Sequence, residues 1–315
     1  MHGPPDDIST PRTYQAALEV GLSATELRGP LWDAPWRGVR VWAGSDVTPA
    51  IRATAAGLLL PDDGGTGAVG GWGAAHLLGA TEIDGLAANG ATPVPVPLYP
   101  THRLRPRRGI VLWRSQLAAD DIVVADGVRV TSKVRTAFDL GRHARGIRDC
   151  VITLDQALRC LDLPLDQLVA YTERHGRWRG VPLLRAAFPL VNPRSRSRPE
   201  SRLRLVWILD AGLPVPQVNP ELSDGRGRLL GLPDLLEEDT GLVGEYDGGQ
   251  HRELGNHTAD NVREEAFERE DLTVVRATSL DLGGIRLVRR LRAGHADAAR
   301  RPRGTWVSVE RPLRR

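Results

Sequence analysis

The chain has 315 residues, of which 41% are hydrophobic and 26% charged, and it carries a formal net charge of +3. This length accommodates two or three domains of roughly 100–200 residues each, and the composition excludes a disordered chain. The start lacks a signal-peptide pattern, and no apolar run approaches the ~20 residues that span a bilayer. The two cysteines, Cys150 and Cys160, are too few for a disulfide framework or a zinc site. Together these features lead us to expect a cytoplasmic protein without membrane partners.

The positive charge is unevenly distributed. From residue 284 to the end, ten arginines stand against only Asp297 and Glu310. Two further basic runs cover residues 102–108 and 194–204. Such clusters suit phosphate backbones, which favours DNA as a partner. The alternative is a solubilising surface in an arginine-rich chain.

Residues 11–45 predict a small winged helix. A helical pattern over 13–20 ends at a glycine, and Ser23 with Glu26 forms a capping box for a second helix over 23–31. Residues 36–44 then alternate apolar and basic side chains, like a strand of a wing. Arg28 is the residue of the second helix that we expect to contact DNA.

Residues 46–190 predict a mixed α/β domain. Helices are expected over 50–60, 70–80, 130–143 and 149–163, and strands over 93–100, 109–117 and 121–130. We interpret His76 as a packing residue. Arg135 and Asp139, four residues apart on a helix, are interpreted as a surface pair rather than as chemistry.

Residues 193–292 predict an α/β layered domain, followed by a basic tail over 293–315. Its first helix has Pro199 in the first turn and ends at Gly212. Strands are expected over 214–222, 229–238, 241–249 and 272–279, and helices over 257–271 and 285–301.

Three acids interrupt the apolar strands of this last domain. Glu245 and Asp247 project from one face of their strand, because side chains alternate with a period of two, while Tyr246 faces away. Asp234 meets them if the preceding strand pairs with this one. Gathering carboxylates away from water is costly, and a divalent cation removes that cost. We therefore expect Asp234, Glu245 and Asp247 to bind Mg²⁺ or Mn²⁺.

Neighbouring residues extend this predicted catalytic site. Glu200 is expected to add a ligand or orient water, and His251 to protonate the leaving oxygen or to hydrogen-bond the turn. Nearby glycines, including Gly244, would let a phosphodiester approach the backbone. Water activation by the metal, with charge neutralisation at phosphorus, is the expected mechanism. The candidate phosphate-binding residues of this domain are Arg198, Arg202, Arg204 and Arg263.

The motif P-D at 233–234, followed by E-x-D-G-x-x-H at 245–251, resembles the PD-(D/E)xK nuclease superfamily. Within it, the stretches PESRLRLVWILDAGLPVPQVN, GEYDGGQHR and LTVVRATSLDL are similar to the domain related to very-short-patch-repair endonucleases. The resemblance implies a restriction-endonuclease-like core over about residues 194–291, a divalent metal and a DNA substrate. The lysine of the third motif is absent, and Asp247 stands in its place.

The upstream part resembles the AbiEi-type antitoxin domain and its winged helix. The similar stretches are ALEVGLSATELRGPLW, WRGVRVWAG and GVRVTSKVRTAFDLGRH. This resemblance implies DNA binding or antitoxin activity, with a cognate toxin as a possible partner. Two hypotheses therefore stand: a metal-dependent DNA endonuclease of defence or repair, and a non-catalytic DNA-binding antitoxin or transcriptional repressor with a degenerate nuclease fold.

Overall fold

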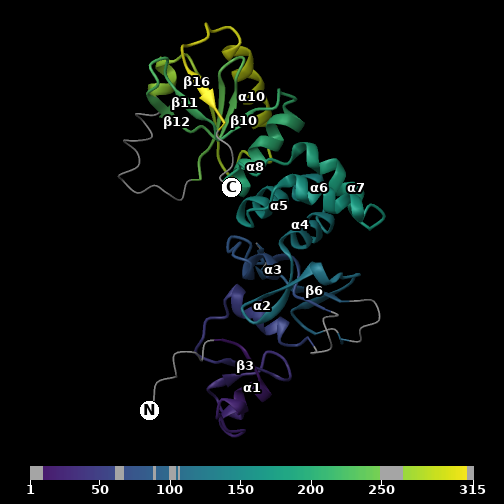
Figure 1. The fold of residues 1–315 in the computed structure, drawn as a ribbon. Coiled ribbons are helices and arrows are strands. Elements are labelled where there is room, and N and C mark those ends of the chain that lie inside the picture. Colours follow the sequence, from purple (N-terminus) through teal and green to yellow (C-terminus); the bar gives the residue numbers. More distant parts are fainter. Residues whose placement is uncertain are drawn as a thin grey trace. The chain divides into compact units, whose positions relative to one another are not determined.

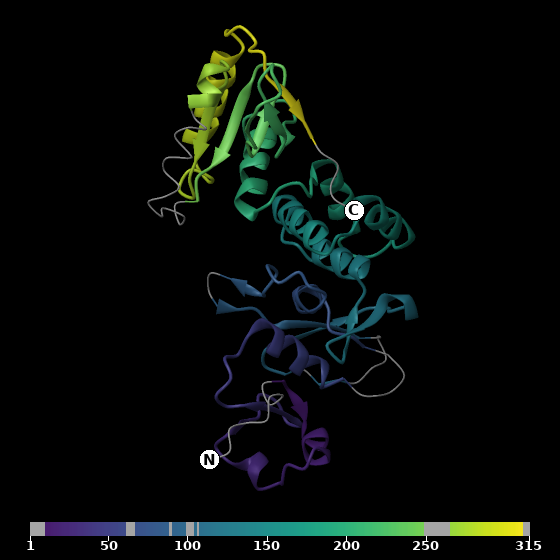
Figure 2. The same ribbon diagram turned by 60° about the vertical axis from the view of Figure 1, so that its left-hand side comes forward.

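The structure is a computed structural model that describes residues 10–60, 67–87, 90–98, 104–105, 107–248 and 265–310 (Figure 1). The chain divides into two compact units, which comprise residues 1–143 with 160–184 and residues 144–159 with 185–315. Both units contain helices and strands, as Figure 2 shows from a second side, and this confirms the predicted α/β class. The border differs from the predicted one near 190, because the helix over 147–160 lies mostly in the second unit.

The first part of unit one is a three-stranded antiparallel sheet with one helix. Strand β3 (Val39–Trp42) lies between β1 (Arg12–Thr13) and β2 (Trp32–Asp33). Helix α1 (Tyr14–Glu19) begins at Thr13, whose hydroxyl accepts a hydrogen bond from the Ala16 amide. The small core contains Ala17, Leu27 and Trp32.

The predicted second helix over 23–31 is wrong. Ser23 and Glu26 do form the reciprocal hydrogen bonds of a capping box, at 2.7 and 3.2 Å. The helix that follows, however, is only the 3₁₀ turn η1 (Glu26–Arg28). Proline at position 30 prevents the residue before it from staying helical. Arg28 is therefore exposed on a short turn and not on a recognition helix.

The rest of unit one surrounds an apolar core that consists mainly of alanine and valine, with Trp72 and Ile110. Helices α2 (Pro49–Gly57), α3 (Gly71–Leu77) and α4 (Lys133–Arg142) confirm three of the predicted helices. Strands β6 (Val94–Leu98) and β7 (Ile110–Arg114) pair in parallel. Figure 1 shows β6 beside α2 and α3. The remaining elements are β4 (Leu86–Ala87), β5 (Gly90–Ala91), η2 (Ala119–Asp121) and α6 (Leu165–Arg174).

The single strand predicted over 121–130 is a hairpin of β8 (Ile122–Ala125) and β9 (Val128–Thr131). Its two-residue turn is Asp126–Gly127, with φ of 48° and 73°. Two successive positive φ angles are the geometry that matches the twist of paired strands, and Asp-Gly adopts them readily. The sequence therefore held a hairpin signal that the apolar pattern concealed.

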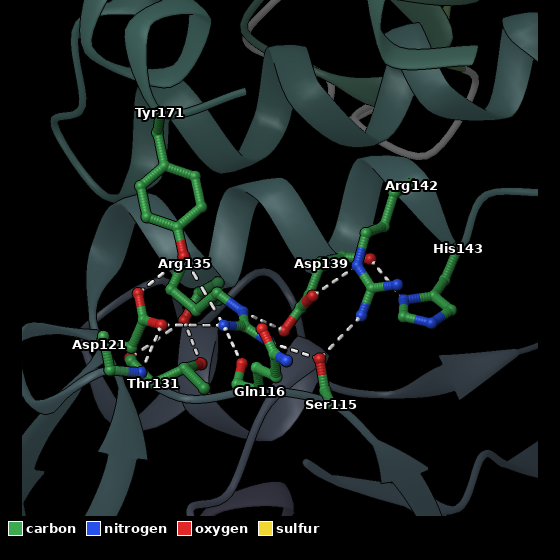
Figure 3. A network of polar contacts seen from close by, with 11 residues as sticks. Ser115, Gln116, Asp121, Thr131, Arg135, Asp139, Arg142, His143 and Tyr171 are labelled. Atoms are coloured by element: carbon green, nitrogen blue, oxygen red, sulfur yellow. Dashed lines mark hydrogen bonds and ion pairs between the residues drawn. The ribbon is translucent and has the colours of Figure 1, made fainter. Parts of the chain in front are cut away.

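A buried ionic network joins α4 to its neighbours in unit one (Figure 3). Arg135 and Asp139 are both completely buried, so the predicted surface pair is wrong. The Arg135 guanidinium donates to Asp139 Oδ2 at 2.8 Å and to Asp121 Oδ2 at 2.9 Å. Further donors and acceptors of the network are Ser115 Oγ, Gln116 O, Arg142 Nε and Tyr171 Oη. Burial and then the hydrogen bond to Asp121 raise the pKa of Tyr171, which therefore donates as a neutral phenol.

Unit two is built on a four-stranded sheet. Its order is β10 (Gln217–Val218), β13 (Leu235–Glu237), β14 (Leu242–Tyr246) and β15 (Thr273–Ala277), antiparallel except for the parallel last pair. A second sheet contains β12 (Leu229–Gly231), β11 (Glu221–Ser223) and β16 (Val307–Val309). The strands predicted over 214–222 and 229–238 are each divided between the two sheets.

Different layers cover the two faces of the four-stranded sheet. Helix α8 (Arg198–Leu205), the π-helical turn η4 (Val206–Asp210) and α10 (Ile285–Ala298) bury one face through Trp207, Leu235 and Val275. On the other face Leu236 and Val243 pack with Leu222, Leu230, Phe267 and Trp306. The remaining helical elements are α5 (Ile147–Cys160), α7 (Val181–Ala187) and η3 (Phe188–Leu190).

The predicted basic tail over 293–315 is wrong for the residues that the structure describes, which end at 310. The border at 292 falls inside α10, whose buried face extends to Ala298. Trp306 is 4% exposed in the second core, and β16 pairs with β11. Apolar burial therefore ties this segment to unit two despite its arginines. Within the described ranges, no helix is long and apolar enough to cross a membrane.

The two cysteines differ in environment, which gives a first prediction. Cys150 on α5 is fully buried, and burial, with Asp149 and Asp155 nearby, raises the pKa of its thiol to about 12. Cys160 is partly exposed. Because only the thiolate is nucleophilic, brief alkylation at neutral pH should label Cys160 well before Cys150 in the folded protein. Peptide mass spectrometry measures this, and denatured protein, in which both thiols react, is the control. Equal labelling of the folded chain would contradict the packing of α5.

Candidate functional site

On one face of the four-stranded sheet of unit two, three neighbouring strands carry apolar side chains that are followed, toward the same end of the sheet, by charged ones. Leu236, Val243 and Val274 lie opposite one another on β13, β14 and β15. Two residues along β14 on the same face, Glu245 pairs with Arg276 of β15. The antiparallel register Leu235–Gly244, extended by one residue, sets Asp234 opposite Glu245. We call Asp234, Glu245 and Arg276 the charged row.

The two carboxylates of the charged row have different contacts. Glu245 is 7% exposed, and its Oε2 lies 3.9 Å from Arg276 Nε. Asp234 Oδ2 accepts a hydrogen bond of 2.8 Å from the Tyr246 amide, which places that carboxylate beside the Glu245–Tyr246 peptide. The predicted meeting of Asp234 and Glu245 therefore agrees with the strand register and with this contact.

Asp247 lies further along the same face but at the exposed end of the strand. Its amide donates to Ala277 O at 2.8 Å, so pairing with β15 continues past Tyr246. Tyr246 projects to the opposite face and packs against the core there. The alternation of Glu245, Tyr246 and Asp247 is thus as predicted, but the side chain of Asp247 is exposed whereas that of Glu245 is buried.

The donor chemistry of the row can be tested against the expected metal. In the part of the chain that the structure describes, no group of three or more His, Cys, Asp or Glu side chains is arranged to hold a metal ion. Mg²⁺, however, usually takes only one or two carboxylates from a protein and completes its shell with water and substrate phosphate. Asp234 and Glu245 supply two hard oxygen ligands side by side, which fits Mg²⁺ or Mn²⁺.

Glu200 has a structural role at the start of α8. Its carboxylate accepts hydrogen bonds from the Arg196 amide and the Ser197 hydroxyl, both at 2.8 Å. Ser197 Oγ in turn accepts from the Glu200 amide, as in a capping box. Asn219 Nδ2 also donates to Glu200, at 3.0 Å. We therefore assign this carboxylate to the helix cap, in place of the predicted ligand or water contact.

Asn219 is a residue of this region that sequence reasoning missed. Its amide donates to Asp234 O at 3.0 Å while its side chain holds Glu200, so it links the helix cap to the strand of Asp234. Its φ of 50° lies in the left-handed region, which asparagine tolerates better than most residues. An asparagine before a proline, between two short strands, was the available signal.

The predicted DNA-binding arginines have different environments. Arg204 is 2% exposed and forms an ion pair with Asp155 of α5, so its assignment to phosphate binding is wrong. Arg198 and Arg202 are exposed on α8, where Arg198 donates to Gln156 at 3.1 Å. His251 and Arg263, predicted as acid and phosphate ligand, lie outside the described residues.

Gly244 serves packing rather than access by a phosphodiester. A Cβ at this position would lie 3.1 Å from the Trp207 ring, on the face opposite the charged row. Glycine therefore lets η4 approach the centre of the sheet closely. The predicted role of this glycine at the site is wrong.

No protein family, curated protein or solved structure with which the chain was compared matches it. The function must therefore be argued from the chemistry of unit two. That chemistry consists of one buried and one half-buried carboxylate next to an arginine, at the end of an apolar sheet. Two carboxylates that can bind a metal ion, with an arginine next to them, suit the binding of a phosphate ester through that metal.

Proposed function

We propose that unit two is a metal-dependent nuclease domain that hydrolyses DNA phosphodiester bonds. The observation that carries the proposal is the juxtaposition of Asp234 and Glu245 across β13 and β14, where the apolar cover of the sheet ends. The order of elements also supports it: a helix, an antiparallel set of strands, and a parallel last strand followed by a helix. These are the two acids of the sequence motif that resembles the PD-(D/E)xK nucleases.

In this proposal each residue of the row has a separate task. Asp234 and Glu245 hold the cation, which when bound supplies an activated water and neutralises charge at phosphorus. The Tyr246 amide keeps the Asp234 carboxylate in position through its 2.8 Å hydrogen bond. Arg276, 3.9 Å from Glu245, offsets part of the negative charge of that buried carboxylate.

A second function, DNA binding without cleavage, is favoured by the same ion pair. Arg276 balances the charge of Glu245 without any metal, which a degenerate nuclease fold in an antitoxin or repressor would need. In this alternative the arginines of the chain bind DNA, and the row only stabilises the sheet. A cognate toxin would then be the expected partner of the whole protein.

Cleavage of plasmid and oligonucleotide DNA in Mg²⁺ or Mn²⁺ separates the two functions. Asp234→Asn and Glu245→Gln keep the shape of each side chain but remove its charge. Each should lower the cleavage rate by more than the roughly 100-fold that loss of an outer-shell partner can cost a metal site. Calorimetry should also show loss of Mn²⁺ binding by both variants.

Asp297→Asn is the matched control, because this acid is 58% exposed on α10 and pairs only with a neighbouring arginine in the described structure. It should cleave and bind Mn²⁺ like the unmodified protein. Tight, metal-independent DNA binding with no cleavage of duplex, single-stranded or mismatched DNA would instead support the antitoxin or repressor.

A further inference from the structure

We propose that Arg276 binds the non-bridging oxygens of the substrate phosphate beside the carboxylate pair. This inference rests on the proposed nuclease function and names a residue that the sequence motif does not contain. It starts from the position of the arginine in the charged row. Glu245 and Arg276 are direct partners in the parallel pairing of β14 with β15, so both side chains leave the same face of the sheet.

The two side chains of this pair differ in exposure. The side chain of Glu245 is 10% exposed, whereas that of Arg276 is 39% exposed, with Nε 3.9 Å from Glu245 Oε2. The guanidinium therefore extends from the buried acid toward solvent. A phosphate that approaches from outside can reach it without displacing the core.

The backbone of Arg276 is held from the other side of the sheet. Arg290 of α10 donates to the Arg276 carbonyl and lies 3.3 Å from Asp281. Asp281 in turn accepts hydrogen bonds from the Thr278 amide and hydroxyl, at 2.8 and 2.9 Å. These contacts fix the end of β15, so the direction in which Arg276 leaves the strand is preset.

The chemistry of arginine selects a binding role and excludes proton transfer. A guanidinium stays protonated at all ordinary pH values, so Arg276 cannot accept a proton from water as an active-site lysine can. Its planar fork instead matches two phosphate oxygens at once. Two neighbouring carboxylates repel a phosphodiester, and a cation beside them reduces that repulsion. Arg276 therefore supplies positive charge near the place where the motif lysine is missing.

Other arginines of unit two are less suited to this role. Arg204 is buried against Asp155. Arg226 is exposed in the turn between β11 and β12, outside the three basic stretches of the sequence. Arg226 thus provides a control that removes the same charge from the same unit but outside the row and outside those stretches.

The test measures the affinity of the full chain for a duplex oligonucleotide in Ca²⁺, over a series of salt concentrations. Arg276→Ala should weaken binding about 10- to 100-fold, as expected for loss of a charged hydrogen bond. It should also lower the slope of log K against log salt by about 0.9, the value for one phosphate contact. Arg276→Lys should keep the slope and lose part of the affinity, because charge remains but the fork does not. Arg226→Ala should change neither quantity.

Mn²⁺ binding separates failure of this inference from failure of the nuclease proposal. Arg276→Ala should bind Mn²⁺ at least as well as the unmodified protein, whereas Asp234→Asn and Glu245→Gln should not bind it. If the acid variants lose metal and cleavage but Arg276→Ala binds DNA with unchanged affinity and slope, only the role of Arg276 is wrong. If the acid variants retain both metal and cleavage, the nuclease site itself is wrong. Arg276→Lys keeps a long side chain and the positive charge, so it tests the proposal even if Arg276→Ala does not fold. DNA affinity equal to that of the unmodified protein in Arg276→Lys would overturn the proposed contact of the guanidinium with two phosphate oxygens.

Discussion

Arg135→Met should lower the unfolding free energy of unit one by about 3–5 kcal/mol, the usual cost of removing one partner from a buried ion pair. Asp139 would keep Arg142, whose Nε lies 2.6 Å from its other oxygen. Asp121 would keep only hydrogen bonds, from the Tyr171 hydroxyl at 2.6 Å and the Ala118 amide at 3.0 Å. Asp121 would then have no ion-pair partner among the described residues, because Arg142 forms its ion pair only with the Asp139 carboxylate, and this uncompensated charge accounts for most of the loss.

Amide hydrogen exchange of the intact chain measures this effect locally. Peptides from α4 and from the β8–β9 hairpin should exchange faster in Arg135→Met, while peptides from β13 and β14 in the other unit should not change. Lys133→Ala is the matched control, since Lys133 is an exposed cation on the same helix. Its effect should stay within about 0.5 kcal/mol, as for most surface substitutions.

The companion variant is Arg135→Lys. A lysine keeps the charge but cannot donate to both Asp121 and Asp139 with the geometry of a guanidinium. Its stability should therefore lie between that of the unmodified protein and that of Arg135→Met. Equal exchange in all three proteins would mean that the Arg135 side chain is in contact with water and not buried.

Local patterns predicted the long helices well, because their signals lie within a few neighbouring residues. The apolar spacing of α4, α5 and α10 and the small residues of α2 and α3 were sufficient. Strands were harder. A period of two says which face a side chain occupies but not which sheet a strand joins. The pattern over residues 229–238 therefore predicts one strand. In the structure β12 ends at Gly231 in one sheet, and β13 begins at Leu235 in the other.

The site shows the same division between local and distant information. Glu245, Tyr246 and Asp247 alternate as predicted, because alternation is a property of one strand. The burial of Arg204 could not be foreseen, since it depends on Asp155, an acid 49 residues earlier in the chain. Arg276 was also missed, because only the parallel pairing of β14 with β15 brings it beside Glu245. An isolated charge in an apolar strand was the signal that pointed to it.

Arg204→Met should destabilise unit two by about 3–5 kcal/mol at neutral pH, for the same reason as in the first network. Asp155 is 1% exposed, and besides Arg204 it accepts hydrogen bonds from Ser201 Oγ at 2.6 Å and from the Asn192 amide at 2.7 Å. These contacts join α5 to α8 and to the segment before it. Exchange of peptides from α5 and α8 should rise, while α4 in the other unit serves as the internal reference.

The pH dependence of Arg204→Met identifies the buried charge as the cause. Burial raises the pKa of Asp155, and Arg204 opposes that effect, so removal of Arg204 must raise the pKa further. When the pKa of a carboxyl is higher in the folded than in the unfolded protein, the protonated form favours the folded state. The free energy of unfolding is then highest below the unfolded pKa of about 3.9, and it falls as pH rises toward the folded pKa. Relative to the unmodified protein, Arg204→Met should therefore be less damaging near pH ~5 than near pH ~8. The double variant Asp155→Asn/Arg204→Met has no carboxyl at position 155 and should lose this pH dependence. If Arg204→Met lowers the free energy of unfolding equally at both pH values, a charged, buried Asp155 is contradicted.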